Sequence, residues 1–240
     1  MSVHADSLDL GYLAAPDGGG PGVVVVHDVW GLSAHYRHIA RRLADEGFVA
    51  LAVDLYKELG GATIQDPGKW MRNLPDVDVL AVNESAAQYL QLHSGVGARG
   101  VAVVGFCMGG MYALLAGASI RGIAAVAPFY GILSYSHGLL YDPAGLDPRK
   151  KPREPLDAAL DVKCPLFGFF GAEDPYVPLT DIRELERRLK GPSREIRVYE
   201  GAGHAFMNDT RPEMFRPEAA ADAWTRLVAF LHQHCGSDRG

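Results

Sequence analysis

A cysteine set between glycines is the first feature with chemical potential. Residues 105–109 read GFCMG, the G-x-nucleophile-x-G pattern with cysteine in the nucleophile's place. An apolar run at 101–104 precedes it and a helix is predicted from about residue 108, so Cys107 is expected at a strand-to-helix turn. Glycines allow such a strained turn, and the start of a helix favours a thiolate. Cys107 is therefore a candidate nucleophile; the alternative is a structural thiol buried in a glycine-rich turn.

An acid and a histidine follow two later apolar runs. Asp174 lies in FFGAEDP and His204 in GAGHAF, each just beyond a predicted strand. The carboxyl ends of parallel strands share one edge of a sheet, so Cys107, Asp174 and His204 are expected to meet there. In that arrangement His204 takes the proton of Cys107, and Asp174 holds the imidazole in the required tautomer. Glu173 is the alternative acid. If the site has no catalytic role, Asp174 is a solvated acid in a turn and His204 is an ordinary loop histidine.

Attack of a thiolate on a carbonyl creates an oxyanion, which two backbone N–H groups must hold. Met108, directly after the nucleophile, is predicted to supply one of them. Val29, in the loop HDVWG after the first buried strand, is predicted to supply the other.

Short apolar runs alternate with helical stretches along the chain. Strands are predicted at Val23–Val26, Phe48–Val53, Val101–Val104, Ile123–Val126, Leu166–Phe170 and Ile196–Tyr199, and helices at 34–46, 77–93, 108–118, 180–190 and 217–234. This alternation predicts an α/β fold, a mostly parallel sheet with helices on both faces. Residues 131–160 break the rhythm and are expected to form an irregular excursion over one edge of the sheet. Since no linker divides the chain, residues 1–240 are expected to form a single domain.

Composition excludes several classes of partner. Lys and Arg number 23 against 29 Asp and Glu, a net charge of −6, which argues against nucleic acid. The N-terminus has no apolar signal segment, and no apolar run reaches the ~20 residues of a membrane span. Cys107, Cys164 and Cys235 have no metal-binding spacing, and His232 and His234 do not share a helix face. We expect a cytoplasmic monomer with reduced thiols and without metal, cofactor, nucleic acid or membrane partner.

The motifs together resemble the dienelactone hydrolase family of the α/β-hydrolase superfamily. They are VVVVHDVWGL, AVDLY at 52–56, GFCMGG, FGAEDPYVP at 170–178 and GAGHAF at 201–206, and they extend from about residue 20 to 235. Nucleophile, acid and histidine also follow one another in the superfamily's order. The resemblance implies an α/β-hydrolase fold, no metal or organic cofactor, and hydrolysis of a lactone or small carboxylic ester. A Cys107–His204–Asp174 triad would carry that reaction through a thioester acyl-enzyme.

Two positions depart from the family's pattern. The family's thiol-holding glutamate is matched by the shorter Asp28, which the resemblance makes the acid that holds the resting thiol. The family's carboxylate-binding arginine, four residues after the histidine, is matched by Asn208. With Arg72 and Arg211 expected on the solvated surface, neutral esters or lactones are predicted to react at least as well as carboxylated dienelactones.

Other functions stay open at this point. One alternative is a non-hydrolytic thiol-redox or binding protein on the same fold. Peptidase or thioesterase activity is another, because the same triad serves any acyl transfer.

Overall fold

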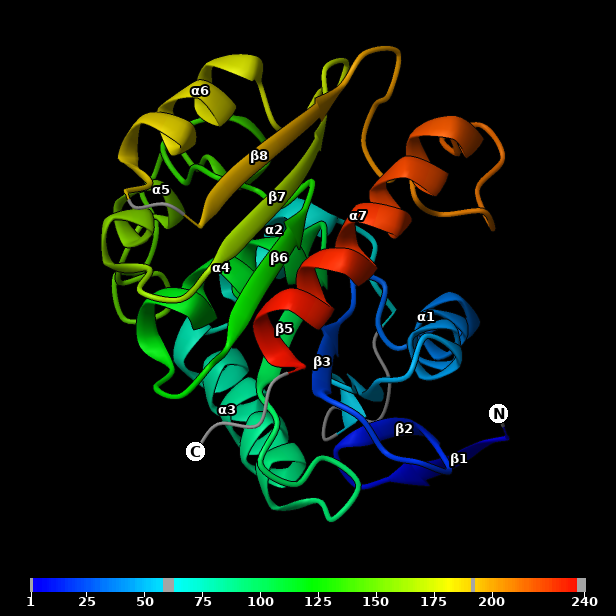
Figure 1. Ribbon diagram of the computed structural model, residues 1–240. Coiled ribbons are helices and arrows are strands. Elements are labelled where there is room, and N and C mark those ends of the chain that lie inside the picture. Colours follow the sequence, from blue (N-terminus) through cyan, green and yellow to red (C-terminus); the bar gives the residue numbers. More distant parts are fainter. Residues whose placement is uncertain (1, 58–62, 191–192, 237–240) are drawn as a thin grey trace.

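The computed structural model describes residues 2–57, 63–190 and 193–236, and eight strands in it form one sheet (Figure 1). The sheet order is β1-β2-β4-β3-β5-β6-β7-β8. The β1–β2 and β2–β4 pairs are antiparallel, and every pair from β4 to β8 is parallel. The strands are β1 Val3–Leu8, β2 Gly11–Pro16, β3 Gly22–Val26, β4 Val49–Val53, β5 Val101–Phe106, β6 Ala125–Phe129, β7 Leu166–Gly171 and β8 Arg194–Tyr199.

Helices cover both faces of the sheet, as the alternation predicted (Figure 1). On one face α1 and α7 pack together, with the guanidinium of Arg42 3.7 Å from the ring centroid of Trp224. On the other face α3 and α4 pack against each other and against β3, β5 and β6. The helices are α1 Ala34–Asp45, α2 Pro67–Asn73, α3 Asp76–Leu92, α4 Met108–Ser119, α5 Pro155–Ala158, α6 Leu179–Arg188 and α7 Pro217–Cys235. The α/β fold with a mostly parallel sheet and helices on both faces, expected from the sequence, is confirmed. No helix in the ranges described is long and apolar enough to cross a membrane.

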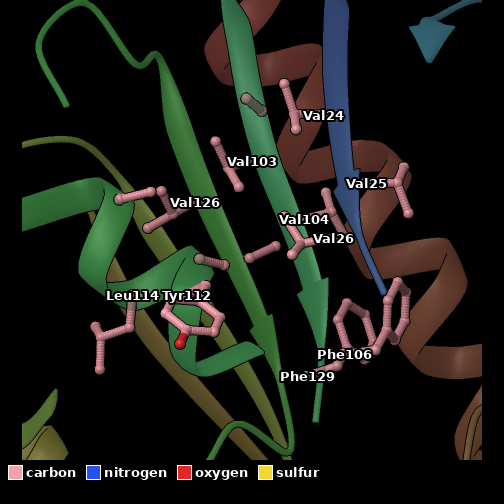
Figure 2. Packing of buried hydrophobic residues seen from close by; sticks show 14 of the residues in the cluster. Val24, Val25, Val26, Val103, Val104, Phe106, Tyr112, Leu114, Val126 and Phe129 are labelled. Carbon is pink, nitrogen blue, oxygen red and sulfur yellow. The ribbon is translucent and has the colours of Figure 1, made fainter. Parts of the chain in front are cut away.

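The central strands are apolar throughout because helices bury both of their faces. Every residue of β3, β4 and β5 is buried, and Figure 2 shows the valines of β3 and β5 packed beside Phe106 and Phe129. Burial of this apolar surface and the close packing around it stabilise the middle of the sheet. The loops that follow β3, β5, β7 and β8 all leave from its carboxyl edge.

Several elements differ from the sequence prediction. The N-terminal hairpin β1–β2 was missed because β1, with sequence VHADSL, is largely exposed and carries no apolar pattern. Helix α2 was missed because it has only seven residues, although its N-cap Asp66 accepts a hydrogen bond from the Lys69 N–H at 2.9 Å. Strand β6 was predicted at Ile123–Val126 but runs to Phe129; Pro128, which lacks a ladder N–H, obscured its second half.

Residues 131–160 pack on α4 and α6, with two 3-10 turns, η2 Gly138–Leu140 and η3 Ala159–Asp161, flanking α5. A buried ionic cluster anchors the segment. Lys151 Nζ donates to Asp76 Oδ1 at 2.6 Å and to the Tyr112 hydroxyl at 3.1 Å, and the Tyr135 hydroxyl donates to Asp76 Oδ2 at 2.9 Å. The irregular excursion is therefore fixed to the helices α3 and α4.

Candidate active site

Cys107 occupies a sharp turn between β5 and α4, as the sequence pattern predicted. Its φ of 57° and ψ of −115° lie outside the regions that side chains favour. A Cβ on Gly105 would lie 1.9 Å from the carbonyl oxygen of Gly109, and one on Gly109 would lie 2.1 Å from that of Val26. The two glycines of the motif are therefore required by backbone contacts within the turn and between the turn and β3.

Strained backbone gathers around this cysteine. Among the described residues, the non-glycine positions with positive φ are Cys107, Tyr130 and Ala205. Tyr130 follows β6, and Ala205 follows His204, so all three lie at the carboxyl edge of the sheet. The Cys107 N–H donates to the Phe129 carbonyl at 3.0 Å, which ties the turn to β6. Such strain persists only where the surrounding structure holds it, and it is concentrated at functional sites.

His204 lies against Asp174, one of the two acids considered. Its Nδ1 is 2.8 Å from Asp174 Oδ2, and both side chains are buried. Asp174 Oδ1 accepts the backbone N–H groups of Tyr176 at 2.8 Å and Val177 at 3.2 Å, so its own turn orients it. Glu173 is exposed. The carboxylate assigns the proton to Nδ1 of His204, which leaves Nε2 for the cysteine.

A glycine lets the loops after β7 and β8 approach closely. A Cβ on Gly171 would lie 2.3 Å from the carbonyl oxygen of Ala202, and the Glu173 N–H donates to that same oxygen at 2.9 Å. The helix α6 and the strand β8 separate these two loops in sequence. Their close contact brings Asp174 to His204.

His204 is enclosed by two tyrosine rings and is electrostatically coupled to Cys107. The ring centroids of Tyr130 and Tyr176 lie 5.1 and 5.0 Å from that of His204. Burial acts to lower the pKa of His204, but the negative charge on Cys107 and hydrogen bonds with Asp174 and Cys107 raise it to about 10. The imidazole is thus held as a cation for as long as the sulfur carries a negative charge.

Val29 and Met108, the predicted oxyanion donors, flank Cys107. Val29 lines the same pocket, and Met108 is the first residue of α4, where a backbone N–H has no helical acceptor. The Tyr56 hydroxyl lies 2.9 Å from the Val29 carbonyl and 3.5 Å from the Met108 sulfur. Tyr56 therefore braces both segments, a role that sequence reasoning missed although AVDLY marks the end of β4.

Asp28 lines the pocket together with Cys107. Its Oδ1 accepts the Trp30 N–H at 2.9 Å, and its carboxylate accepts a hydrogen bond from the Tyr36 hydroxyl. Burial, together with the Asp28 charge, raises the pKa of Tyr36, so that hydroxyl stays protonated and donates. The role of Asp28 in holding the resting thiol stays a prediction.

The pocket above Cys107 has a volume of about 270 Å³. Large side chains from five segments wall it, namely Trp30, Pro67, Leu139, Tyr176 and Met214. A larger hollow of about 510 Å³ lies between β8 and α7, but its lining contains no cysteine or histidine. No three His, Cys, Asp or Glu side chains in the ranges described are grouped to hold a metal ion.

Arg211 also lines the pocket above Cys107, so the prediction that it lies on the solvated surface was wrong. Its guanidinium lies 5.7 Å from the ring centroid of Trp30. Two consecutive turns bring it there: the Asn208 N–H donates to the Ala205 carbonyl at 2.9 Å, and the Arg211 N–H donates to the Asn208 carbonyl at 3.1 Å. The position of the Arg211 guanidinium in the pocket therefore depends on the path of this loop in three dimensions and could not be predicted from the sequence.

Asn208 and Arg72 serve the structure around the site. Asn208 is buried, and its Oδ1 accepts the N–H and the hydroxyl of Thr210 at 3.0 and 2.6 Å. Arg72 was also expected on the solvated surface, but it donates to the Leu139 carbonyl at 3.2 Å and pairs with Asp142. It thereby ties the excursion, and with it one wall of the pocket, to α2.

Comparisons of the sequence and of the structure with known proteins point to one family. The sequence model of the dienelactone hydrolase family matches residues 10–235. A Yersinia pestis protein named "Putative carboxymethylenebutenolidase" is 33% identical over 93% of this chain and 83% of its own. A Bradyrhizobium protein named "Probable 2-oxo-3-(5-oxofuran-2-ylidene)propanoate lactonase" is 33% identical over 95% of this chain and 90% of its own.

A solved structure named "Putative Dienelactone Hydrolase" from Klebsiella pneumoniae covers 97% of this chain and 100% of its own, with a TM-score of 0.85 and 31% identity. The match extends over almost the whole chain and includes every segment that carries the site described above. The chain belongs to the dienelactone hydrolase family and is a lactone or ester hydrolase on the α/β-hydrolase fold.

Proposed function

We propose that the protein hydrolyses a lactone or small carboxylic ester through a thioester on Cys107, with His204 as base and Asp174 as its orienting acid. The observation that carries the proposal is the pair of contacts on one imidazole. Nδ1 of His204 lies 2.8 Å from the Asp174 carboxylate, and the same ring lines one pocket with Cys107, close enough for the charge of the sulfur to raise its pKa. This is the geometry that nucleophilic catalysis by a base-activated thiol requires.

Acylation begins with the proton of Cys107 on His204. The thiolate attacks the carbonyl carbon, and the N–H groups of Val29 and Met108 receive the developing oxyanion. When the tetrahedral intermediate collapses, the C–O bond of the ester or lactone ring breaks, and the imidazolium gives its proton to the leaving oxygen. The product of this step is a thioester on Cys107.

Deacylation needs a neutral imidazole, and the same electrostatics supply it. Once Cys107 is a thioester, it no longer carries the charge that raises the pKa of His204. Burial, which lowers that pKa, is then opposed by fewer charges, so the pKa of His204 falls. The neutral imidazole can then take a proton from water. Hydroxide adds to the thioester carbonyl, the C–S bond breaks, and the thiolate returns beside the imidazolium.

The pocket also bears on the substrate's charge. Arg211 places a guanidinium on its wall, where it can pair with a carboxylate on the substrate. The guanidinium carbon lies 5.7 Å from the ring centroid of Trp30, which lines the same pocket. We therefore propose a lactone or ester that carries a carboxylate, in contrast to the neutral substrates predicted from sequence.

Single substitutions with an acyl-trapping experiment test the triad. Cys107→Ala and His204→Ala are each expected to remove nearly all turnover of a small ester and a small lactone, because triad members act as a unit. Cys164→Ala, a cysteine change in another part of the fold, is the matched control and should keep wild-type rates. Rapid quenching of the wild type with a slow ester should add one acyl group to Cys107, as located by peptide mass mapping. Turnover that survives in Cys107→Ala would overturn the proposal.

A further inference from the structure

His27 is a fully buried histidine at the end of β3, directly before the loop that carries Val29. It does not touch the substrate in the mechanism above. Its Nδ1 lies 2.5 Å from the backbone carbonyl oxygen of Asp28, and its Nε2 lies 3.2 Å from the backbone N–H of Leu55, just after β4. The ring therefore joins the loops that follow two neighbouring strands.

The two partners determine the tautomer of His27. A backbone N–H can only donate, so Nε2 must accept the hydrogen bond of Leu55 and must carry no proton. A carbonyl oxygen can only accept, so the proton is on Nδ1 and is donated to Asp28. Burial lowers the pKa of His27, although the neighbouring Asp28 and Asp54 act in the opposite direction. The neutral ring with one donor and one acceptor matches both partners.

The carbonyl that His27 holds belongs to the same peptide unit as the proposed oxyanion donor. The C=O of Asp28 and the N–H of Val29 share one planar trans peptide, so they point in opposite directions. Fixing the oxygen therefore fixes the direction of the N–H. The Gly31 N–H also donates to this oxygen but at 3.3 Å, so the histidine contact is the shorter of the two.

The neighbouring peptide is held independently. The Tyr56 hydroxyl lies 2.9 Å from the Val29 carbonyl, and its ring packs edge-on against His27, with centroids 5.0 Å apart. The loop is thus restrained at two successive carbonyls, and only the first of them sets the Val29 N–H.

We propose that His27 is a positioning residue that holds the Asp28–Val29 peptide so that the Val29 N–H faces the oxyanion. This inference rests on the proposed function, because it assumes acyl transfer at Cys107. Its consequence is specific: losing the contact weakens transition states that carry an oxyanion and leaves the thiol and ground-state binding unaffected.

Two amide substitutions separate the two contacts of the ring. In His27→Asn the side-chain amide occupies the place of Nδ1 and can still donate to Asp28. In His27→Gln the amide reaches the place of Nε2, where its oxygen can accept from Leu55, but the donor to Asp28 is lost. Removing an oxyanion donor outright lowers kcat by ~10²–10³. For a misaligned donor we expect His27→Gln to lose roughly 10–100-fold in kcat with KM little changed, and His27→Asn to stay within about threefold of wild type.

Two inhibitors report on the oxyanion separately from the thiol. A trifluoromethyl ketone adds to Cys107 to give a charged tetrahedral oxygen, so its affinity should fall in His27→Gln in parallel with kcat. Iodoacetamide alkylates the same sulfur without forming an oxyanion, so its rate should match wild type in both variants. Equal losses in the two variants, or an alkylation rate that falls with kcat, would overturn the proposal in favour of a merely structural role.

Nitrogen-15 NMR of the histidines tests the wild-type enzyme directly, whether or not the variants fold. The proposal requires a neutral His27 with the proton on Nδ1, and a proton on Nε2 would overturn it. Failure of the proposed function looks different, since Cys107→Ala would then retain turnover and no acyl adduct would form on Cys107.

Discussion

Replacing Arg211 by methionine tests how the pocket recognises charge. Methionine keeps an unbranched apolar stem against Trp30 but removes the guanidinium, whereas Arg211→Lys keeps the charge and removes the fork. A hydrogen bond to a charged group contributes roughly 1.5–3 kcal/mol. Since about 1.4 kcal/mol corresponds to a tenfold change in rate, Arg211→Met should lower kcat/KM for a carboxylated lactone by roughly 10–100-fold.

The charges nearby set the limits of that value. Coulomb's law gives about 4 kcal/mol for unit charges ~4 Å apart at an effective dielectric constant of ~20. Asp28 and Asp66, which line the same pocket, repel a substrate carboxylate and reduce the net gain. The lower figure of 1.5–3 kcal/mol is therefore the appropriate one for a solvent-connected pocket.

The assay compares initial rates on a lactone that carries a carboxylate and on its neutral carboxamide. Wild type should prefer the carboxylate, Arg211→Met should lose that preference, and Arg211→Lys should fall between them. The neutral substrate should change by less than about twofold, because the contact contributes nothing to its transition state. Arg226→Met, which removes the same charge from the exposed side of α7, is the control and should leave both rates unchanged.

Equal losses on both lactones in Arg211→Met would mean that the side chain acts through packing on Trp30 and not through its charge. A wild-type preference for the neutral lactone would support the substrate class predicted from sequence and refute the role of Arg211.

Three further outcomes follow from the contacts of the site. Asp174→Asn removes a carboxylate that helps to raise the pKa of His204 to about 10. In the wild type, kcat/KM should fall at alkaline pH near that pKa, because the imidazolium then loses its proton. In Asp174→Asn this fall should occur at lower pH, and an unchanged pH profile would contradict the reasoning. Asp28→Asn should speed alkylation of the nucleophilic thiol by iodoacetamide in the ligand-free enzyme, and an unchanged rate would show that Asp28 does not hold the resting thiol. Gly105→Ala places a Cβ 1.9 Å from a backbone oxygen of α4 and should lower the free energy of unfolding by roughly 1–3 kcal/mol or more, measured in urea; Gly18→Ala, where a Cβ meets nothing within 4 Å, is the control.

Much of the fold could be predicted because its signals are local. The central strands are continuous apolar runs since both of their faces are buried, and the helices between them show their own periodicity. The hairpin β1–β2 gave no such signal. The pairing of β2 with β4, and not the composition of β1, adds these strands to the sheet. The end of β6 was missed because proline is normally disfavoured inside a central strand. Here the neighbouring strand β5 pairs with β6 through Pro128 despite that preference.

The residues at the centre of the site were also readable in the sequence. Gly105 and Gly109 mark the turn because the backbone within a few residues would collide with any side chain there. Asp174 and His204 each follow a strand, and parallel strands end at one edge, so their convergence follows from topology alone. Asp174 was preferred over Glu173 from the sequence, and the structure pairs His204 with Asp174 while Glu173 is exposed, because neighbours in sequence point in different directions from a turn.

Only the tertiary structure decided what surrounds these residues. Arg211 enters the pocket because two turns fold its loop back over Trp30, and no spacing in the chain encodes that path. His27 and Tyr56 hold the loop of Val29 through hydrogen bonds that join different strand ends. The sequence by itself determined the fold class and the residues proposed as reactive groups, because their signals lie within single elements. The charge of the pocket and the bracing of its loops depend on contacts between elements, which exist only once the chain has folded.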